Sequence, residues 1–296
     1  DHIKNQKQNL AATAILYRNN LSVIPLADAL DRAGIPFYVG ESNKLRFFNH
    51  WAVTDILNFL RMSYSDKNVD LLDLLKSKLQ PFVTKGQIEI LRATASKRSV
   101  FDLLSEQETK KEKQKSFLSL KEQFQRLNKL PPQKAIQTIR KEMGYDKTVE
   151  NICDSLGFSQ EYVYTVLNIL EDIAGKESTH PGFASRLNCL KERIDTAYRN
   201  KAKNVVTLST IHSAKGLEWE NVFVVDLVQG ILPNYQAIKQ ADGKKFEALE
   251  EERRLFYVAM TRAQKHLTLC TSKTYHNSPM NISQFVKEAQ LLSEGK

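Results

Sequence analysis

The sequence predicts an α/β protein in which a parallel-sheet domain is interrupted by an all-helical insertion. Apolar runs typical of buried strands flank an amphipathic helix at the start of the chain. Residues 51–198 instead carry apolar residues at helical spacing, and β-rich runs return from Asn204 onwards. The sheet domain is therefore expected to comprise residues 1–65 and 201–296, with the helical insertion at 66–200.

The first elements are predicted from short patterns. Thr13–Tyr17 is an apolar run and is predicted to be a buried strand. Ser22–Ala33 is predicted to be an amphipathic helix, and Gly34 follows where a left-handed turn commonly ends a helix. Pro36–Val39 is predicted to be a second strand. This order of strand, helix and strand indicates a parallel α/β unit.

The middle of the chain shows hardly any strand signal. The charged stretch Glu106–Lys115 and the break at Leu130–Pro132 are predicted to be linkers between helices. The helical spacing is clearest in Ala52–Met62, Val69–Leu79, Phe117–Leu127 and Tyr162–Ala174. This pattern is typical of a helical bundle.

The last third of the chain returns to α/β character. Val205–Ser209 and Val222–Leu227 are predicted to be strands. Glu247–Thr261 is predicted to be a helix that leads into the strand His266–Thr271. A final helix is predicted over Ser283–Leu292. These elements complete the sheet that the beginning of the chain starts.

Composition excludes several protein classes. Of the 296 residues, 42% are hydrophobic and 26% are charged, which is typical of soluble globular proteins. No apolar run approaches the roughly 20 residues that span a bilayer, and the polar segment Asp1–Leu10 does not resemble a signal peptide. Because the chain begins at Asp1 rather than at a methionine, a fragment or a processed protein is expected. Cys153, Cys189 and Cys270 lie too far apart for a metal site, so reduced thiols in a cytoplasmic protein are expected.

The charge balance is positive. The formal net charge is +9, and a positive excess favours polyanions because neutralising phosphates releases condensed counterions. The stretch Lys110–Lys115 fits either a DNA contact or a solvated helix face. Charge alone therefore leaves open both nucleic-acid binding and an ordinary basic protein.

The segment Thr210–Trp219 lies between two predicted strands. The ligand sites of α/β sheets lie in loops at strand ends. Gly216 permits close backbone approach, Lys215 supplies a positive charge, and Glu218 supplies an acceptor. Further hydrogen-bonding side chains are those of Thr210, His212 and Ser213. By chemistry alone, a ligand-binding loop and an ordinary polar loop explain the segment equally well.

The predicted helix near the C-terminus carries an arginine-rich segment, Glu250–Ala263. Its acidic start suits the amino end of a helix, and Arg254 and Arg262 lie one turn before and after Val258. Arginine suits phosphate recognition because its planar guanidinium is permanently charged. An alternative is that Glu251 or Glu252 pairs with a nearby arginine on a solvated helix face.

Tyr17 and Arg18 end the first predicted strand. A ring in that position could stack on a base, and the arginine could reach a phosphate. Tyrosines at strand ends are also commonly structural. The segment Ala14–Asn20 therefore does not by itself distinguish a binding role from a structural one.

Together these segments resemble the UvrD/Rep (PcrA-like) family of superfamily 1A DNA helicases. The resembling segments, in order, are Ile15–Asn19 (motif IV), Gly34–Gly40 with Phe47–Leu57 (motif IVa), Thr210–Glu218 (motif V), Asn221–Pro233 (the following strand and loop) and Glu251–Ala263 (motif VI). The resemblance implies a RecA-like domain 2A, without a P-loop, at 1–65 and 201–296. It implies that the helical insertion is subdomain 2B.

The resemblance implies roles in an ATP site shared with domain 1A of the same polypeptide. Arg262 is expected to be the arginine finger, and Arg18 a second contact to the γ-phosphate. Tyr17 is expected to pack beside the adenine, Glu218 to accept from the ribose, and Gly216 to lie against the nucleotide.

The resemblance also implies contacts to single-stranded DNA and ss/ds junctions. Thr210, His212 and Ser213 are expected to contact the single strand. DNA repair or DNA replication is the implied setting.

The sequence departs from the family pattern in two places. No G-x-x-x-x-G-K-[ST] segment occurs, so ATP with Mg²⁺ is expected to need the P-loop and metal ligands of domain 1A, and the chain alone is predicted to be inactive. The stretch Leu79–Gly86 lacks the Gly-Ile-Gly turn with which many relatives grip duplex DNA. Translocation with little unwinding is therefore one expectation.

Two other functions remain open from the sequence. One is a motor subunit fragment of an AddA/RecB-type helicase–nuclease, in which a nuclease would follow the second motor domain. The other is a non-catalytic DNA-binding module of helicase fold. The arginine at position 262 favours a motor, because DNA binding alone needs no γ-phosphate contact.

Overall fold

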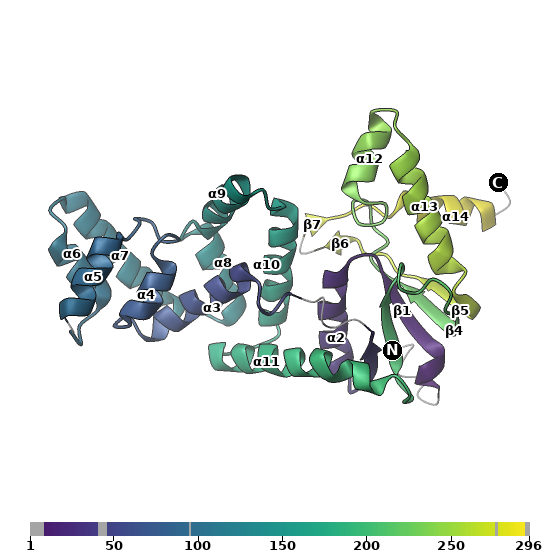
Figure 1. The fold of residues 1–296 in the computed structure, drawn as a ribbon, viewed down its shortest axis with the longest axis horizontal. Helices are drawn as coiled ribbons and strands as arrows, with labels where there is room; N and C mark the ends of the chain where they lie inside the picture. Colours follow the sequence, from purple (N-terminus) through teal and green to yellow (C-terminus); the bar gives the residue numbers. More distant parts are fainter. Residues whose placement is uncertain (1–8, 41–45, 95, 276–277, 294–296) are drawn as a thin grey trace. The chain divides into compact units, whose positions relative to one another are not determined.

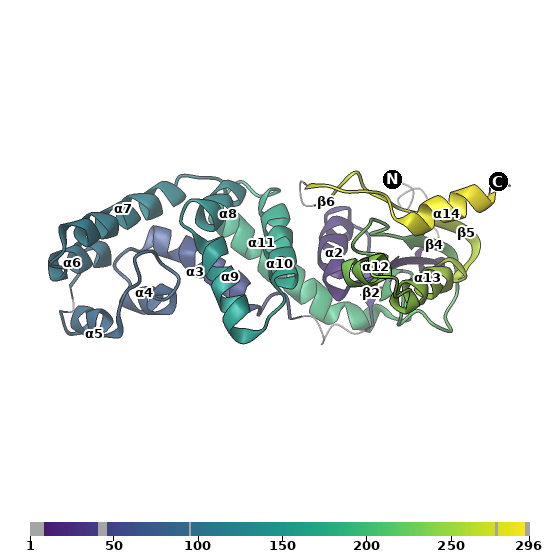
Figure 2. The ribbon, with the colours of Figure 1, turned by 90° about the horizontal axis from the view of Figure 1, so that it is seen from above.

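The computed structural model describes residues 9–40, 46–94, 96–275 and 278–293. The chain forms two compact units, a sheet unit of residues 1–45 with 189–296 and a helical unit of residues 46–188 (Figures 1 and 2). Helix α11, His180–Ala197, begins in the helical unit and ends in the sheet unit.

The sheet unit contains a parallel sheet of five strands in the order β2-β3-β1-β4-β5. The strands are β1 Thr13–Tyr17, β2 Phe37–Val39, β3 Val206–Thr210, β4 Trp219–Val224 and β5 Ala263–Leu269. The helices are α2 Val23–Arg32, α12 Tyr235–Asp242, α13 Glu247–Met260 and α14 Gln284–Ser293, with 3₁₀ turns at Leu10–Ala12, Asn20–Ser22 and Tyr198–Asn200. A two-stranded antiparallel sheet joins β6 Thr274–Tyr275 to β7 Ser278–Pro279. This confirms the α/β fold class with a parallel, RecA-like sheet.

The central strand β1 is buried along its whole length, as its continuous apolar run predicts. The prediction was less accurate for the later strands. β4 begins at Trp219, three residues before the predicted start, and β5 begins at Ala263 rather than His266. The physical reason is pairing across the sheet, because Trp219 lies opposite Ala263 and its N–H donates to the carbonyl of Arg262.

One hydrophobic core joins the sheet to α13 and α14. Leu16 of β1 and Val224 of β4 are fully buried in it. Phe256 of α13 and Phe285 of α14 stack with their ring centroids 5.8 Å apart. The same core takes up Ile211 and Ala214, so the loop between β3 and β4 is anchored by buried side chains.

The helical unit contains no strand among its described residues. Its complete helices are α3 Trp51–Tyr64, α4 Val69–Leu75, α5 Lys85–Thr94, α6 Val100–Gln107, α7 Lys111–Leu127, α8 Pro132–Lys141, α9 Tyr145–Leu156 and α10 Gln160–Ala174. Helices α6 and α7 take up most of the stretch Glu106–Lys115, so the prediction of a long charged linker there was wrong. Only residues 108–110 connect the two helices.

Stacked rings build the core of the helical unit. The ring of Phe124 in α7 stacks on those of Phe59 and Phe101, at centroid distances of 5.9 and 5.2 Å. The buried Asp55 of α3 accepts a hydrogen bond from the Tyr145 hydroxyl at 2.8 Å and pairs with Lys78. Helix α3 thus packs within the helical unit, whereas the expected boundaries assigned residues 1–65 to the sheet domain.

None of the helices in the described residues is both long enough and apolar enough to cross a bilayer.

Candidate functional site

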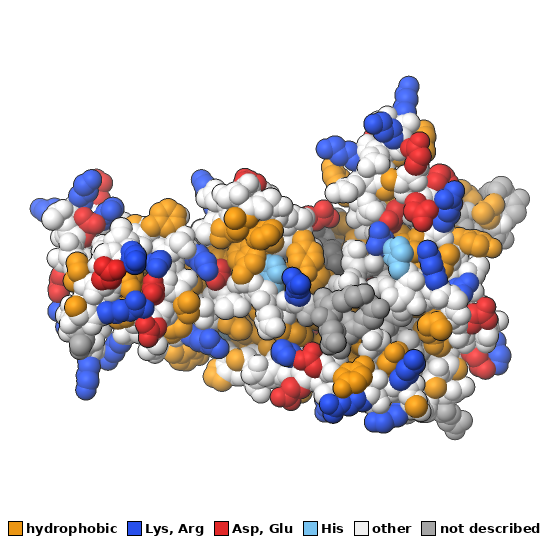
Figure 3. All heavy atoms as spheres, viewed as in Figure 1, with side chains coloured by type: hydrophobic (Ala, Val, Ile, Leu, Met, Phe, Trp, Pro, Cys, Tyr) orange, Lys and Arg blue, Asp and Glu red, His pale blue; other side chains and the backbone are white. Residues whose placement is uncertain are grey.

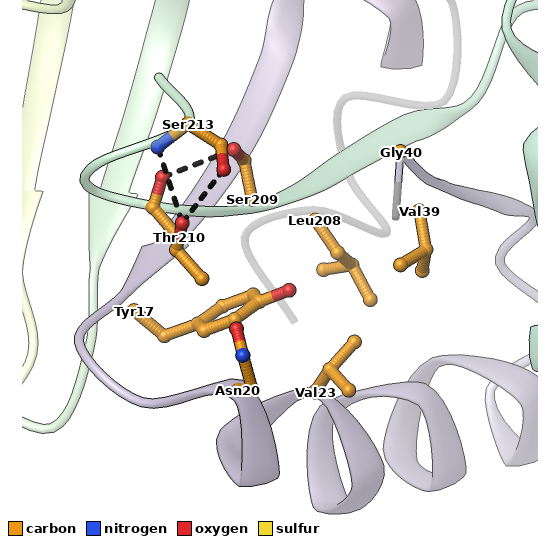
Figure 4. A pocket seen from close by; sticks show the side chains of 9 residues that line it. All are labelled: Tyr17, Asn20, Val23, Val39, Gly40, Leu208, Ser209, Thr210 and Ser213. Carbon is orange, nitrogen blue, oxygen red and sulfur yellow. Dashed lines mark hydrogen bonds between the residues drawn. The ribbon is translucent and has the colours of Figure 1, made fainter. Parts of the chain in front are cut away.

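Several predicted site residues meet at the carboxyl ends of the first three strands in the sheet order. Tyr17 of β1 lies opposite Thr210 of β3, and Val39 ends β2 beside them. A pocket opens at this edge between Tyr17, Asn20, Val23, Val39, Gly40, Leu208, Ser209, Thr210 and Ser213 (Figure 4). The structure thus brings together a predicted aromatic contact and two predicted DNA-binding residues.

The hydroxyl groups at the start of the 210–219 loop are held in a tight turn. Thr210 Oγ1 accepts a hydrogen bond from the backbone N–H of Ser213 at 3.1 Å, and its own hydroxyl lies 3.0 Å from Ser213 Oγ (Figure 4). This is a local side-chain cap of the kind that threonine and serine form in turns. The pair is exposed, so the turn presents both hydroxyls at the carboxyl edge.

Tyr17 is buried although it lines the pocket, with only 4% of its surface exposed. Burial raises the pKa of its hydroxyl well above the usual range, so the ring stays neutral near physiological pH. The buried position fits a packing role as well as a contact to a ligand.

Arg18 follows Tyr17 and forms an ion pair across the fold. Its Nε donates to both carboxylate oxygens of Glu252 at 3.2 and 3.3 Å, and its Nη2 donates to Oε1 at 2.7 Å. Glu252 lies on α13 and is 6% exposed. Asn234 Nδ2 donates to the same carboxylate at 2.8 Å. The alternative expected from the sequence was that Glu251 or Glu252 pairs with a nearby arginine on a solvated helix face. Glu251 does pair with Arg254, whereas Glu252 pairs with Arg18.

The imidazole of His212 is exposed next to this ion pair. Partial burial, followed by the charges of Arg18 and Lys215, lowers its pKa, while Glu252 and Glu251 act in the opposite direction. His212 is therefore mainly neutral at physiological pH and can both donate and accept hydrogen bonds.

A second group of predicted residues lies where β4 and β5 begin. Arg262 Nη1 donates to the carbonyl oxygen of Leu217 at 3.0 Å, and Nε donates to the carbonyl oxygen of Val258 at 3.0 Å. Glu218 accepts a hydrogen bond from Gln264 Nε2 at 3.1 Å. The end of the 210–219 loop is thus tied to the end of α13.

The two groups lie at opposite edges of the sheet. Leu16, two residues before Arg18, lies opposite Val224 at the end of β4, whereas Ala263 after Arg262 lies opposite Trp219 at its start. The length of β4 separates the two arginine backbones by at least about 17 Å at 3.3 Å per residue. Each guanidinium is also held at its own edge by protein partners.

This separation divides the residues predicted for the ATP site into two groups. Tyr17 and Glu218 lie at opposite edges. Arg18 and Arg262 are likewise at opposite edges in this arrangement. Tyr17 and Arg18 therefore lie with the predicted DNA-binding residues and not with Glu218 and Arg262.

Comparison with known proteins shows the family. The family model described as the UvrD-like helicase C-terminal domain matches residues 1–274. The chain belongs to this family of UvrD-like helicase C-terminal domains. The curated proteins it resembles include an ATP-dependent DNA helicase Rep of Buchnera aphidicola, 29% identical over 93% of this chain and 44% of the relative. They also include a putative ATP-dependent DNA helicase YjcD of Bacillus subtilis, 28% identical over 96% of this chain and 37% of the relative.

An ATP-dependent DNA helicase PcrA of Staphylococcus aureus gives a similar match, 28% identical over 93% of this chain and 39% of the relative. The UvrD-like chain thus spans about two fifths of the length of these relatives. The resemblance to UvrD/Rep helicases that the motifs predicted is confirmed.

The UvrD-like family match does not by itself identify Glu252 and Asn234, which the sequence interpretation left without a role at the site. They lie 234 and 216 residues after Arg18, and only the fold brings them together. The acidic run before the arginines was the available signal, but it does not tell which carboxylate turns inward.

The distribution of surface charge does not single out the candidate site in this UvrD-like chain. On the face shown in Figure 3, acidic and basic side chains are interspersed over both units. Lys110, Lys111, Lys113 and Lys115 are exposed, as either interpretation of that stretch expects. In the described ranges there is no group of three or more His, Cys, Asp or Glu side chains that could hold a metal ion.

Proposed function

We propose that this chain is the C-terminal motor portion of an ATP-dependent DNA helicase or translocase of the UvrD/Rep type. The relatives that match most of it, Rep, YjcD and PcrA, are described as ATP-dependent DNA helicases, YjcD as a putative one. The observation that carries the proposal is the hydrogen bond between Arg262 and Leu217. It places the arginine of one predicted motif beside the end of the other, where Glu218 also lies.

The amino edge is the proposed nucleotide side. Arg262 is the proposed arginine finger, Glu218 the proposed ribose contact, and Gly216 gives the loop its close backbone approach. Arg262 can exchange a neutral carbonyl for a phosphate, which is a stronger partner for a guanidinium. Leu217 and Tyr257 expose 49% and 63% of their surfaces near this edge, as expected where a second domain packs.

The second domain is proposed to supply what this chain lacks. No Walker A segment occurs in the sequence, and the described residues offer no metal-binding cluster. A domain 1A is proposed to bring the P-loop and the Mg²⁺ ligands. ATP with Mg²⁺ would then be bound between the domains, with Arg262 facing the γ-phosphate.

The carboxyl edge is the proposed single-strand side. Thr210 and Ser213 present hydroxyls in a fixed turn, and His212 lies between them in sequence. Hydroxyl and imidazole groups bind phosphate and sugar without regard to base identity. The 210–219 loop joins this edge to Glu218, so it connects the proposed DNA and nucleotide sides within a single segment.

The helical unit is proposed to be subdomain 2B. Residues 79–86 lead into α5 without a Gly-Ile-Gly turn. Movement along a single strand with limited unwinding is therefore proposed, with ss/ds junctions as a secondary substrate.

The test is ATP hydrolysis by the intact protein, with and without single-stranded DNA, beside an Arg262→Ala variant. DNA-stimulated hydrolysis that the variant loses, while it still binds nucleotide, would support the proposal. The matched control is Arg126→Ala, because Arg126 is an exposed arginine of α7 in the helical unit, paired with Glu142. A folded parent that binds nucleotide but does not hydrolyse it would overturn the motor function.

A further inference from the structure

A short basic turn follows α11 in the sheet unit. Residues 198–203 contain Arg199, Lys201 and Lys203 and no acidic side chain. All three cations are exposed, and none of them pairs with a carboxylate among the residues that the structure describes. This segment, called the basic turn below, thus carries three positive charges that the fold does not neutralise.

The basic side chains on the last turns of α11 are arranged differently. Lys191 pairs with Asp195 on the same helix. Arg193 pairs with Asp31 of α2. Because neighbouring like charges repel one another and do not stabilise a fold, an anionic ligand explains the three unpaired cations of the basic turn better than folding does.

The backbone of the basic turn is fixed by the residues around it. Ala197 and Val205, on either side, are only 1% and 5% exposed. Within the turn, Asn200 Nδ2 donates to the carbonyl oxygen of Phe37 at 3.0 Å, and its Oδ1 accepts from Lys203 Nζ at 3.0 Å. A turn that is already ordered loses less conformational entropy when it binds a ligand.

An aromatic ring lies among these charges. Tyr198 exposes 49% of its surface. The guanidinium of Arg199 lies 5.6 Å from the centre of the Tyr198 ring, and Arg199 Nε donates to the Tyr198 hydroxyl at 3.1 Å. Proteins that bind single strands combine an exposed ring, on which a base stacks, with cations that bind the phosphates.

The basic turn is separate from both proposed sites of the sheet unit. It contacts the start of β2 through Asn200 and Phe37, whereas Arg262 precedes β5. In the sheet order β2 and β5 are four strand spacings apart, which is about 19 Å at about 4.8 Å per spacing. The turn also precedes β3, and Thr210 lies at the opposite end of that strand.

We propose that the basic turn is a second contact for single-stranded DNA, in which a base stacks on Tyr198 and the three cations bind neighbouring phosphates. This inference rests on the proposed function, in which the intact protein binds DNA. A single strand fits better than a duplex, because paired bases do not offer a free face to a ring on the protein surface. An acidic protein segment would use the charges but would not require the exposed ring.

The experiment measures binding of a labelled oligothymidylate to the intact protein by fluorescence anisotropy over a series of salt concentrations. Each phosphate contact to a single strand contributes about 0.7 to the slope of log affinity against log salt. The triple variant Arg199→Gln, Lys201→Gln and Lys203→Gln is expected to lower the affinity and to reduce the slope by about 1 to 2. Thermal unfolding checks that each variant is folded.

The matched control removes three other charges. Lys129, Lys134 and Lys141 are exposed lysines of the helical unit. The triple variant Lys129→Gln, Lys134→Gln and Lys141→Gln changes the net charge by the same amount and is expected to leave the slope unchanged. An equal reduction of the slope in both triple variants would show a general effect of net charge and overturn the inference.

Variants of Tyr198 test the stacking. Tyr198→Ala is expected to lower the affinity about 5-fold or more and to keep the salt slope, because it removes a ring and no charge. Tyr198→Phe keeps the ring and is expected to keep the affinity. A loss with Tyr198→Phe as large as that with Tyr198→Ala would overturn base stacking at this position.

The remaining outcomes separate this inference from the proposed function. A parent that fails to bind the oligothymidylate would overturn both. A binding parent whose affinity and slope are unchanged in the triple variant of the basic turn would overturn this inference alone. If that variant instead loses binding of a labelled polyglutamate peptide, the basic turn binds an acidic protein segment, and the inference is likewise overturned.

Discussion

Arg262 donates from Nη1 to the carbonyl oxygen of Leu217 across 3.0 Å, and this bond ties the end of α13 to the end of the 210–219 loop. Nε and Nη2 of the same guanidinium bond to Val258 and Thr261. Among the residues that the structure describes, Arg262 binds neutral partners, so its charge is available to an anion. The residue thus combines a modest structural role with the proposed catalytic one.

Replacing Arg262 by alanine is expected to separate these two roles. Its bonds are largely exposed, so the free energy of unfolding is expected to fall by only about 1 kcal/mol. ATP hydrolysis by the intact protein is expected to fall by about 10³-fold or more, the range seen when an arginine finger is removed. Urea unfolding and steady-state hydrolysis measure the two effects.

Arg262→Lys is the matched variant. Lysine keeps the charge but lacks the planar guanidinium, so it is expected to retain most of the stability and little of the activity. Full activity with lysine would show that a simple positive charge is enough at this position.

Gly216 gives a prediction for the 210–219 loop. Its φ is +82°, and a Cβ there would meet nothing within 4 Å, so alanine would bring backbone strain without a clash. Gly216→Ala is expected to destabilise the protein by about 1 kcal/mol, the cost of a left-handed conformation for an L-residue. It is also expected to weaken DNA-stimulated ATP hydrolysis, since the loop connects the two proposed sides.

Gly157 provides the control for this prediction. It ends α9 in the helical unit with φ +70°, and a Cβ there also meets nothing within 4 Å. Gly157→Ala is expected to cost similar stability and to leave hydrolysis unchanged. Equal effects of both variants on hydrolysis would remove any special role for the loop.

The sequence predicts an element well where the pattern that specifies it lies within the element's own residues. Strand β1 was predicted with its observed bounds because burial on both faces gives a continuous apolar run. Helix α13, which ends shortly before Arg262, was predicted almost to its ends, since its acidic first turn and apolar spacing are both local. By contrast, the start of β4 depends on Trp219 lying opposite Ala263, which no local pattern encodes.

The candidate site shows the same limit. The motifs predicted which residues carry chemistry, but their grouping depended on which strand ends meet. Arg18 and Arg262 are both arginines in helicase motifs, yet the parallel sheet places one after β1 and the other before β5. The partner of Arg18 was missed because Glu252 is 234 residues away in the chain.

Variants of Tyr17 test the proposal that the nucleotide and the DNA strand bind at opposite edges of the sheet. Tyr17→Phe keeps the buried ring, so stability is expected to change little, and the KM for ATP is expected to stay at the parent value. Tyr17→Ala removes a buried aromatic ring and is expected to cost about 3–5 kcal/mol of stability. A raised KM for ATP in the stable Tyr17→Phe variant would return this residue to the nucleotide side.

The stability of the chain is expected to depend on pH through His180. This histidine is 6% exposed, and burial lowers its pKa, which outweighs an opposite effect of the Leu130 carbonyl. At pH above about 6.5 the imidazole is neutral in both the folded and the unfolded chain, so His180 does not make the free energy of unfolding depend on pH there. As the pH falls below that value, the unfolded chain takes up a proton that the folded chain does not, and stability is lost.

His180→Gln cannot titrate at this position. Between pH 7.5 and 5.5, on the two sides of an ordinary histidine pKa of about 6.5, this variant is therefore expected to lose less stability than the parent in urea unfolding. His266→Gln, which removes an exposed histidine of β5, controls for the change in composition. If the parent and His180→Gln lose the same stability over this interval, the buried imidazole is not the source of the pH dependence.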